Sequence, residues 1–468
     1  MNIVRETRRW FMANIKDRTS PYFLDKNQAK IVCDNHKNTL VTARAGSGKT
    51  RTIVAKIIYL LAHEHIKPEE IIVFAFNKKA CNEINERLTT ILFQNRPLFN
   101  KPPNIATTFH AFAYQLLGGS HALKNHLLTE EDTRFNESPS QFIVRAEQKF
   151  FKDYTKLYEK INNLKNKEQK QILLKEFQKM KKYHQLLTKE SKLNFNQLIA
   201  KAAKKLPSKT PYRYIFIDEY QDFSLLFLTL IKSLRTTCKD AHLLSVGDDW
   251  QAINRFAGSD VEYFIHFEKY FPEDCVKLFI PTNYRSGKKI VKNANFFMSR
   301  ALNDYAGCKA KNKTKSKIIY GKCENYIEVV RKIISNNPNK TIKILSRNND
   351  LRFRKMSLEK FAKKLNIINQ NISFSTIHKS KGLEADIVIL LEIDPEKFPS
   401  HDKTNSLYEI FGDNAITLFK DEVRLFYVAL TRAKEKIYIL SKNPKITKQN
   451  RRYNFFNYLN PDYLDPLL

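Results

Sequence analysis

The segment that most constrains the fold covers residues 43–50 and has the sequence Ala-Arg-Ala-Gly-Ser-Gly-Lys-Thr. The β-prone residues 39–42 precede it, and apolar residues follow at helical spacing over 53–61. A strand, a glycine-rich turn, a Lys-Thr pair and a helix in this order are typical of a P-loop, in which backbone N–H groups at the helix N-terminus surround phosphate oxygens. We expect Lys49 to neutralise those phosphates and the Thr50 hydroxyl to bind Mg²⁺.

Glycine is scarce in this chain and therefore informative. There are 11 glycines in 468 residues, whereas an average usage of ~7% would give about 33. Six of the 11 lie in five polar clusters that each adjoin an apolar strand or helix: Gly46, Gly48, Gly247, Gly258, Gly287 and Gly382. We expect these clusters to hold the functional residues.

A pair of acids follows the apolar run 214–217. A P-loop needs a carboxylate on another strand to hold its metal, and Mg²⁺ keeps several waters when it binds to proteins. Asp218 is the candidate for this role, and Glu219 is the candidate to orient and deprotonate an attacking water. The alternative, a solvated acid pair at a strand end, is disfavoured by the four apolar or aromatic residues directly before it.

The stretch from Gly247 to Gly258 follows another β-prone run, residues 242–246. Its Gln251 is a neutral amide that suits the sensing of a terminal phosphate. Phe256 offers a ring for base stacking, although a phenylalanine taken alone more often packs in a core.

Composition narrows the class of protein. The 81 Lys and Arg residues against 48 Asp and Glu residues give a net charge of +33, which indicates an anionic partner such as nucleic acid; a generally lysine-rich surface is the alternative. No apolar run reaches the ~18 residues of a membrane span, and charge near the N-terminus disfavours a signal peptide. Six cysteines without a C-x-x-C pair disfavour a zinc or iron–sulfur site and favour a cytoplasmic location.

Nine motifs occur in a fixed order. They are Gln28, the P-loop, Phe76–Ala80, Thr107–Phe112, Asp218–Asp222, Gly247–Gly258, Asn283–Ser286, Thr376–Asp386 and Arg424–Lys434. This set resembles that of the UvrD/Rep-type superfamily 1 helicases over about residues 20–445, and its wording is most similar to the DNA helicase IV branch.

The resemblance implies an α/β fold with two RecA-like P-loop motor domains on parallel sheets, a helical 1B insertion and a nearly absent 2B insertion. The expected divisions are a basic N-terminal helix in 1–20, motor domain 1A in 21–113 and 201–279, subdomain 1B in 114–200, motor domain 2A with minimal 2B in 280–445, and a C-terminal tail in 446–468. The lysine-rich stretch 151–190 within 1B is either a solvated face or a DNA-facing surface.

The resemblance also assigns ATP and Mg²⁺ as cofactors. The residues that it places at ATP are Gln28, Ala45, Gly46, Ser47, Gly48, Lys49, Thr50, Arg51, Tyr284, Arg285, Glu384 and Arg432. It makes Lys49, Asp218, Glu219, Gln251, Arg285 and Arg432 catalytic, and it gives Thr50 and Asp218 to the metal. In the family's pattern Gln28 reads the adenine edge, Tyr284 stacks on the base, Arg285 reaches the γ-phosphate and Arg432 is an arginine finger; Glu384 lies near the ribose.

On the DNA side, the resemblance implies a single-strand path lined by Phe76, Asn77, Thr108, His110, Phe256, Arg347, Thr376 and His378. Gln251 would couple the γ-phosphate to these contacts. Four positions depart from the family's wording: Ala43 and Arg44 replace small P-loop residues, Asn254 replaces an aromatic residue, and Val423 replaces an arginine. A phosphate contact and a partner contact both stay open for Arg44.

The expected activity is ATP-driven 3′→5′ movement on single-stranded DNA and unwinding of 3′-tailed duplexes in repair or recombination, by a monomer without membrane contact. A protein loading or nuclease partner is also expected. The alternatives are a translocase or DNA-end sensor in an anti-phage defence complex, and a DNA-binding scaffold for which ATP is only a conformational ligand. RNA stays open as a substrate, because stacking and backbone contacts discriminate poorly between nucleic acids.

Overall fold

The computed structural model describes residues 2–17, 20–94, 104–123, 125–128, 140–151, 153–351, 356–366, 371–394, 398–399, 409–442 and 454–467. The chain divides into two compact units. The first unit contains Met1–Ala43, Lys49–Ile280 and Thr404–Asp413, and the second contains Arg44–Gly48, Pro281–Lys403 and Asn414–Leu468. In the parts of the chain that the structure describes, no helix is long and apolar enough to cross a membrane.

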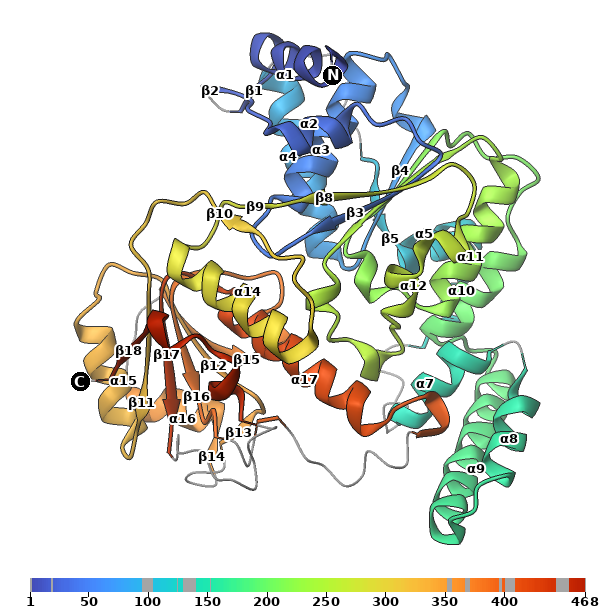
Figure 1. Cartoon of the computed structure of the whole chain (residues 1–468). Helices are drawn as coiled ribbons and strands as arrows, with labels where there is room; N and C mark the ends of the chain where they lie inside the picture. Colours follow the sequence, from blue (N-terminus) through green and yellow to red (C-terminus); the bar gives the residue numbers. More distant parts are fainter. Residues whose placement is uncertain are drawn as a thin grey trace. The chain divides into compact units, whose positions relative to one another are not determined.

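The first unit is built on a six-stranded sheet in the order β5-β4-β6-β7-β3-β8, in which every pair is parallel (Figure 1). The strands are β3 (Asn38–Ala43), β4 (Ile71–Ala75), β5 (Ala106–Thr108), β6 (Tyr214–Ile217), β7 (His242–Gly247) and β8 (Cys275–Ile280). A parallel sheet covered on both faces needs strands that are apolar throughout. Strand β4 shows this: Val73 packs in one hydrophobic core, and its neighbours Ile72 and Phe74 pack in another.

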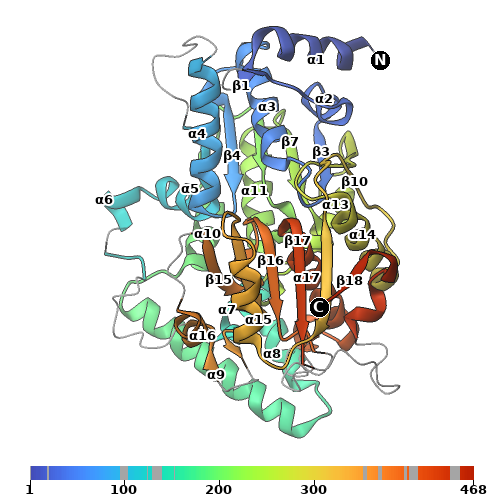
Figure 2. The ribbon, with the colours of Figure 1, turned by 90° about the vertical axis from the view of Figure 1, so that its left-hand side faces the viewer.

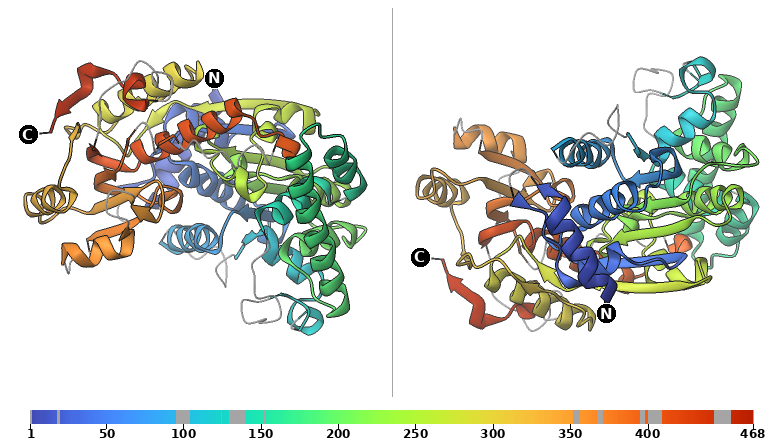
Figure 3. Two further views of the ribbon diagram at one scale, coloured as in Figure 1. Left: turned by 90° about the horizontal axis from the view of Figure 1, so that it is seen from below. Right: turned by 90° about the horizontal axis from the view of Figure 1, so that it is seen from above.

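Helices cover these two cores. Helices α2 (Lys26–Val32), α3 (Lys49–Ala62) and α4 (Lys78–Gln94) supply residues to the core of Val73, and α10 (Phe195–Lys204) and α11 (Leu225–Thr237) supply residues to the core of Phe74. Helix α1 (Asn2–Asn14) belongs to the same unit: its Phe11 is fully buried in the core of Val73. Figure 3 shows α1, in dark blue, lying against the blue helices of this unit.

The described residues between β5 and β6 are mainly helical. They form α5 (Phe109–Leu116), α6 (Gly119–Leu123), α7 (Gln141–Phe150), α8 (Tyr154–Asn162), α9 (Lys167–Lys189) and α10. Helices α8 and α9 lie side by side (Figure 1) and bury Leu157, Ile161, Leu173 and Phe177 in a core of their own. The helical insertion that the resemblance implied is therefore present.

The second unit contains another six-stranded parallel sheet, in the order β15-β12-β16-β17-β11-β18. Its strands are β11 (Lys317–Lys322), β12 (Ile342–Ser346), β15 (Ile372–Thr376), β16 (Ala385–Leu391), β17 (Ala433–Ser441) and β18 (Leu464–Pro466). Figure 2 shows β15, β16, β17 and β18 of this sheet. The predicted fold class, two parallel α/β sheets, is confirmed.

Four helices belong to this sheet: α14 (Lys288–Leu302), α15 (Tyr326–Ser335), α16 (Leu358–Leu365) and α17 (Ala415–Leu430). Two short strand pairs accompany them, β9 (Thr282–Asn283) with β10 (Lys309–Ala310) and β13 (Asp350–Leu351) with β14 (Met356–Ser357). From β12 to β15 the described residues hold only β13, β14 and α16, which agrees with a minimal 2B insertion. The predicted domain boundaries stay predictions, and the one after residue 445 lies outside the described residues.

A short segment before α17 packs with the helical part of the first unit. Ile410 and Phe411 join the core of α7, α8 and α9. The guanidinium of Arg145 on α7 donates to both carboxylate oxygens of Asp413 at 2.5 and 2.7 Å, and its centre lies 4.9 Å from the Phe411 ring centroid. Both charged side chains are buried, so the charge of each is neutralised mainly by the charge of the other.

Removing one member of this ion pair leaves a buried charge without compensation. We expect Asp413→Ala to destabilise the first unit by about 3–5 kcal/mol, measured as a shift of the urea midpoint followed by circular dichroism. The control is Glu359→Ala on α16, whose pair with Lys363 is fully exposed, and we expect no measurable shift for it. An Asp413→Ala curve that overlays the wild-type curve contradicts the interpretation.

Candidate functional site

The P-loop has the backbone of a phosphate cradle. Gly46 and Gly48 have φ values of +74° and +83°, a left-handed conformation that residues with a Cβ rarely adopt. A Cβ on Gly46 would also lie 2.7 Å from the Cβ of Arg285. Helix α3 begins at Lys49 directly after the turn, so its first N–H groups point to the place where an anion would bind.

Lys49 faces two acids that come from the end of β6. Its Nζ lies 3.2 Å from Oε2 of Glu219. Burial alone lowers the pKa of Lys49, but the carboxylates of Glu219, Asp248 and Asp218 outweigh it and raise the pKa. Burial is the main cause that raises the pKa of Asp218, and the charge of Glu219 raises it further. The positive charge of Lys49 acts in the opposite direction and lowers this pKa. The P-loop lysine and the acid pair, predicted from separate segments, therefore lie together.

The backbone of Glu219 is strained. Its φ is +53° and its ψ +42°, a left-handed conformation that is uncommon for a residue with a side chain. Its N–H donates to Oδ1 of Asp218 at 2.9 Å. Strained residues of this kind concentrate at functional sites, where the surrounding structure holds them in place.

Gln221 joins this acid pair to the segment after β7. Its side-chain Nε2 donates to Oε2 of Glu219, and its Oε1 accepts from the backbone N–H of Asp248 at 2.8 Å. Oδ2 of Asp248 in turn accepts from Nε2 of Gln251 at 2.6 Å. Gly247 allows this approach, because a Cβ there would lie 2.5 Å from Oε1 of Gln221.

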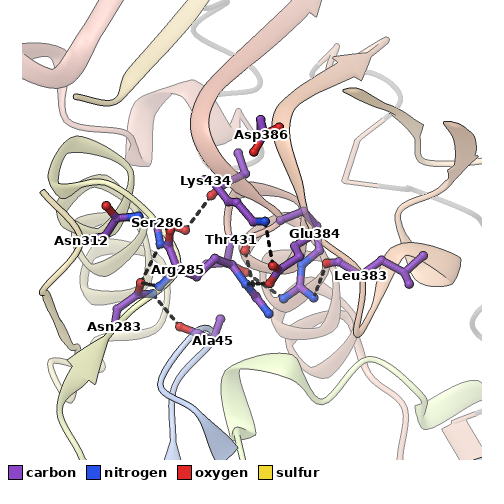
Figure 4. A network of polar contacts seen from close by, with 12 residues as sticks. Ala45, Asn283, Arg285, Ser286, Asn312, Leu383, Glu384, Asp386, Thr431 and Lys434 are labelled. Carbon is purple, nitrogen blue, oxygen red and sulfur yellow. Dashed lines mark hydrogen bonds and ion pairs between the residues drawn. The ribbon is translucent and has the colours of Figure 1, made fainter. Parts of the chain in front are cut away.

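In the second unit, Asn283 organises the segment that carries Tyr284 and Arg285 (Figure 4). Its Oδ1 accepts from the N–H groups of Arg285 and Ser286, each at 2.9 Å. Its Nδ2 donates to the carbonyl of Ala45 at 2.6 Å, and the N–H of Tyr284 donates to the carbonyl of Gly46 at 2.7 Å. The P-loop turn and this segment are therefore hydrogen-bonded to each other at two points.

Arg285 pairs with a carboxylate of the same unit (Figure 4). Its Nε donates to Oε2 of Glu384 at 2.6 Å, and Lys434 Nζ lies 3.0 Å from Oε1 of the same carboxylate. Burial by itself raises the pKa of Glu384, but the two cations outweigh it and lower the pKa. A carboxylate and two cations thus form one ionic cluster.

Arg432 lies beside this cluster. Its N–H groups donate to the carbonyl of Val428 at 2.9 Å and to that of Leu383 at 3.3 Å, and its side chain is buried. Glu384 directly precedes β16 and Arg432 directly precedes β17, and the carbonyl of Arg432 accepts from the N–H of Ala385 at 3.1 Å. Parallel pairing of these strands thus brings the two residues together at the amino edge of the second sheet.

Four further nucleotide candidates occupy defined places. Gln28 forms a capping box with Asp25 at the start of α2, its Oε1 accepting from the Asp25 N–H at 3.1 Å. The guanidinium of Arg51 lies 4.2 Å from the Tyr22 ring centroid. The ring of Tyr284 is 37% exposed, and Lys311 Nζ lies 5.3 Å from its centroid. Thr50 is the second residue of α3, beside Lys49.

The nucleic-acid candidates of the first unit follow strands of the same sheet edge. Phe76 and Asn77 come directly after β4, Thr108 ends β5, and His110 lies in the first turn of α5. Phe76 is 42% exposed and Phe256 is 47% exposed, so the structure favours a surface role over a core role for Phe256. Burial lowers the pKa of His110.

In the second unit, Arg347 follows β12, and Thr376 and His378 lie at the end of the neighbouring β15. Arg347 donates to both oxygens of Glu422 on α17 at 3.1 and 2.6 Å. Burial, together with the cations Arg347 and Lys381, lowers the pKa of His378 to about 4. His378 is therefore neutral at physiological pH.

Two of the departures from the family's wording, Arg44 and Val423, have a structural explanation, and nothing in the structure explains Asn254. Arg44 is buried, and its Nε donates to the carbonyl of Ala306 at 2.8 Å, a contact within the second unit. The carbonyl of Asn254 accepts from the N–H of Ala257 at 2.9 Å in the turn that carries Phe256. Val423 is fully buried on α17, where an arginine would need a partner.

Sequence reasoning did not select Gln221 or Asn283 as site residues. Both are buried, at 0% and 2% exposure, and both lie inside motifs that were recognised. The signal that identifies them is a neutral amide, with one donor and one acceptor group, placed next to charged site residues.

Comparison with known proteins agrees with this arrangement. The description "UvrD/REP helicase N-terminal domain" matches residues 24–272, and "UvrD-like helicase C-terminal domain" matches residues 352–443. DNA helicase IV of Escherichia coli (strain K12) is 28% identical over 90% of this chain and 69% of that protein. The putative ATP-dependent DNA helicase YjcD of Bacillus subtilis (strain 168) is 30% identical over 60% of this chain.

A probable DNA helicase of Mycoplasma pneumoniae is 25% identical over 89% of this chain and 82% of that protein. The fraction of each relative's length that this chain covers varies: it is 69% for DNA helicase IV but only 39% for YjcD. The match to the N-terminal helicase domain alone covers more than half of the chain, and the C-terminal match adds the part that contains Glu384 and Arg432. The chain therefore belongs to the UvrD/REP helicase family.

Proposed function

We propose that this protein is an ATP-dependent DNA helicase or translocase that moves 3′→5′ on single-stranded DNA and unwinds 3′-tailed duplexes in DNA repair or recombination. One observation carries the proposal. The P-loop lysine, the acid pair and the amide of Gln251 lie at the carboxyl edge of one parallel sheet, linked by hydrogen bonds, and exposed rings follow neighbouring strands of that edge. Ligands of parallel sheets bind at this edge.

In this proposal the P-loop and the acid pair perform the hydrolysis step. The turn at Gly46 and Gly48 cradles the phosphates and Lys49 neutralises them, while Glu219 orients and deprotonates the attacking water. The donor set fits Mg²⁺, which takes one or two protein oxygens and the phosphates; Asp218 and Thr50 would hold it. When bound, the metal supplies positive charge that stabilises the phosphates during transfer.

The second unit supplies the remaining charge. We assign Arg285 to the γ-phosphate and Arg432 to the negative charge that develops on the transferred group. Tyr284, with its partly exposed ring, stacks on the adenine that Gln28 reads. Ala45, Ser47 and Arg51 complete the nucleotide contacts, and Glu384 lies near the ribose.

For the nucleic acid, we propose that Phe76 and Phe256 stack on bases and that Asn77, Thr108, His110, Arg347, Thr376 and His378 line the same strand. Stacking tolerates any base sequence, which suits a protein that moves along a strand. The net charge of +33 supports backbone binding. A translocase or end sensor in an anti-phage defence complex is the second candidate function, favoured by the short stretch of chain, residues 347–371, between β12 and β15 in the 2B position.

The first test removes the P-loop charge. We expect Lys49→Ala to lower DNA-stimulated ATP hydrolysis by at least about 100-fold, because the phosphates lose their nearest cation, measured with a phosphate-release assay and a dT oligonucleotide. Lys30→Ala, at an exposed position of α2, is the control. Full activity of Lys49→Ala shows that the P-loop assignment is wrong.

The second test compares substrates. We expect ATP-dependent strand separation of a duplex with a 3′ single-stranded tail and much slower separation of 5′-tailed and blunt duplexes, followed by gel or fluorescence. Preference for the 5′ tail overturns the polarity. DNA-stimulated hydrolysis without separation of any of the three favours the translocase or end sensor instead.

The third test concerns charge. Phosphate contacts release counterions, so we expect binding to a single-stranded oligonucleotide to weaken at least about tenfold between roughly 50 and 200 mM salt. Fluorescence anisotropy measures it, with an RNA oligonucleotide of the same sequence for comparison. A flat response to salt contradicts the assignment of the excess lysines and arginines to a nucleic-acid backbone.

A further inference from the structure

Two segments of the first unit are joined at three separate points. The segment 219–223 follows β6 and carries Glu219, and the segment 248–260 follows β7 and carries Gln251 and Phe256. Besides the bond of Gln221 to the Asp248 N–H, Ser259 Oγ donates to the carbonyl of Asp222 at 2.8 Å, and the N–H of Asp260 donates to the carbonyl of Phe223 at 2.9 Å. A displacement of one segment is therefore carried to the other.

The hydrogen bond of Gln221 differs from the other two that join the segments, because the same side chain also contacts a charged residue of the candidate site. Its Nε2 donates to Oε2 of Glu219, the same oxygen that Lys49 approaches at 3.2 Å. Its amide is fully buried and uses the acceptor and the donor group at once. Oε2 of Glu219 is thus contacted by both the P-loop lysine and Gln221.

The other end of the connection is at the surface. Asp248 binds Gln221 through its backbone N–H, and its carboxylate accepts from Nε2 of Gln251. Four residues after Gln251, a 3-10 turn, Arg255–Ala257, begins and presents Phe256, which is 47% exposed. A base that stacks on this ring would act on the segment to which Gln221 is bonded.

We propose that Gln221 is a positioning residue that transmits DNA contact at the Phe256 turn to the carboxylate of Glu219. The proposal rests on the function proposed above, since it assigns the regulation of the same hydrolysis site. When the segment 248–260 moves, the amide of Gln221 moves with the Asp248 N–H and shifts the hydrogen bond on Glu219 Oε2. The rate at which Glu219 reaches the orientation that activates water therefore depends on DNA binding.

The structure of Gly247 supports this assignment. A Cβ at position 247 would lie 2.5 Å from Gln221 Oε1 and 3.0 Å from the Gln221 backbone nitrogen. Its φ is outside the left-handed region, so the backbone conformation does not require glycine. The close approach of Gln221 requires it, together with the Phe264 ring, which a Cβ would approach to 2.8 Å.

The test replaces Gln221 by methionine, which has a similar volume but makes neither hydrogen bond. ATP hydrolysis is measured without DNA and with saturating dT oligonucleotide. We expect the stimulation by DNA to fall about tenfold, while KM for ATP and the DNA concentration for half-maximal stimulation stay within about twofold of wild type. A residue with a purely structural role would change KM or DNA binding together with kcat.

Two further variants make the result decisive. Gln221→Glu keeps an acceptor for the Asp248 N–H, so the hydrogen bond between the two segments is kept, but it lacks the donor to Glu219. We therefore expect it to lose the stimulation by DNA as Gln221→Met does. Tyr220→Phe is the matched control: Tyr220 is the buried neighbour of Gln221, its hydroxyl has no hydrogen-bond partner within the described part of the chain, and we expect full stimulation. Thermal melting checks that each variant folds.

The outcomes separate this proposal from the one on which it rests. If wild type hydrolyses ATP without response to DNA, the proposed function fails. If wild type responds and a folded Gln221→Met or Gln221→Glu variant keeps the same stimulation factor, or lowers both rates equally, the assignment of Gln221 is wrong.

Discussion

Parallel pairing of the first sheet is the constraint on which the site depends. Strands β5, β4, β6, β7 and β3 are neighbours in that order and run in one direction, so all of them end at the same edge. The residues that follow them are therefore brought together although some, such as Gly46 and Gln251, lie more than 200 positions apart in sequence. The nucleic-acid candidates of this unit follow β5, β4 and β7, and the nucleotide candidates follow β6, β7 and β3. One edge thus holds both sets of residues.

Attraction between opposite charges then determines how closely the side chains of these residues approach one another. Lys49 lies in a largely buried place where burial alone would favour its neutral form, and three carboxylates keep it charged. In the second unit, Arg285 and Lys434 pair with the carboxylate of Glu384, whose side chain is 41% exposed. Buried charges are stable only when they are paired and hydrogen-bonded. The neutral amide of Gln221 therefore joins the carboxylate of Glu219 to the backbone of Asp248, at a place where a further charge would be unfavourable.

Much of the fold and of the site was predictable because local patterns specify them. The apolar runs ending in Asp218 and Gly247 predicted strands, and the glycine-rich turn before Lys49 predicted the phosphate cradle. Phe256 shows the limit of such reasoning: its sequence neighbours are compatible with both core and surface, and the structure exposes it. The pairing of Arg145 with Asp413 shows the same limit, because nothing in either local sequence indicates a partner 268 positions away.

The sequence by itself determined the family, the two parallel sheets and the chemical identity of the site residues, because motif spacing, strand pattern and residue type are local properties. The tertiary structure alone decided which side chains hold one another. It placed Gln221 between Glu219 and Asp248, directed Arg44 to the carbonyl of Ala306, and packed Ile410 and Phe411 with α7. Such contacts depend on where strands and helices from distant segments meet, and distances of a few ångströms between them are set by packing, which no local pattern encodes.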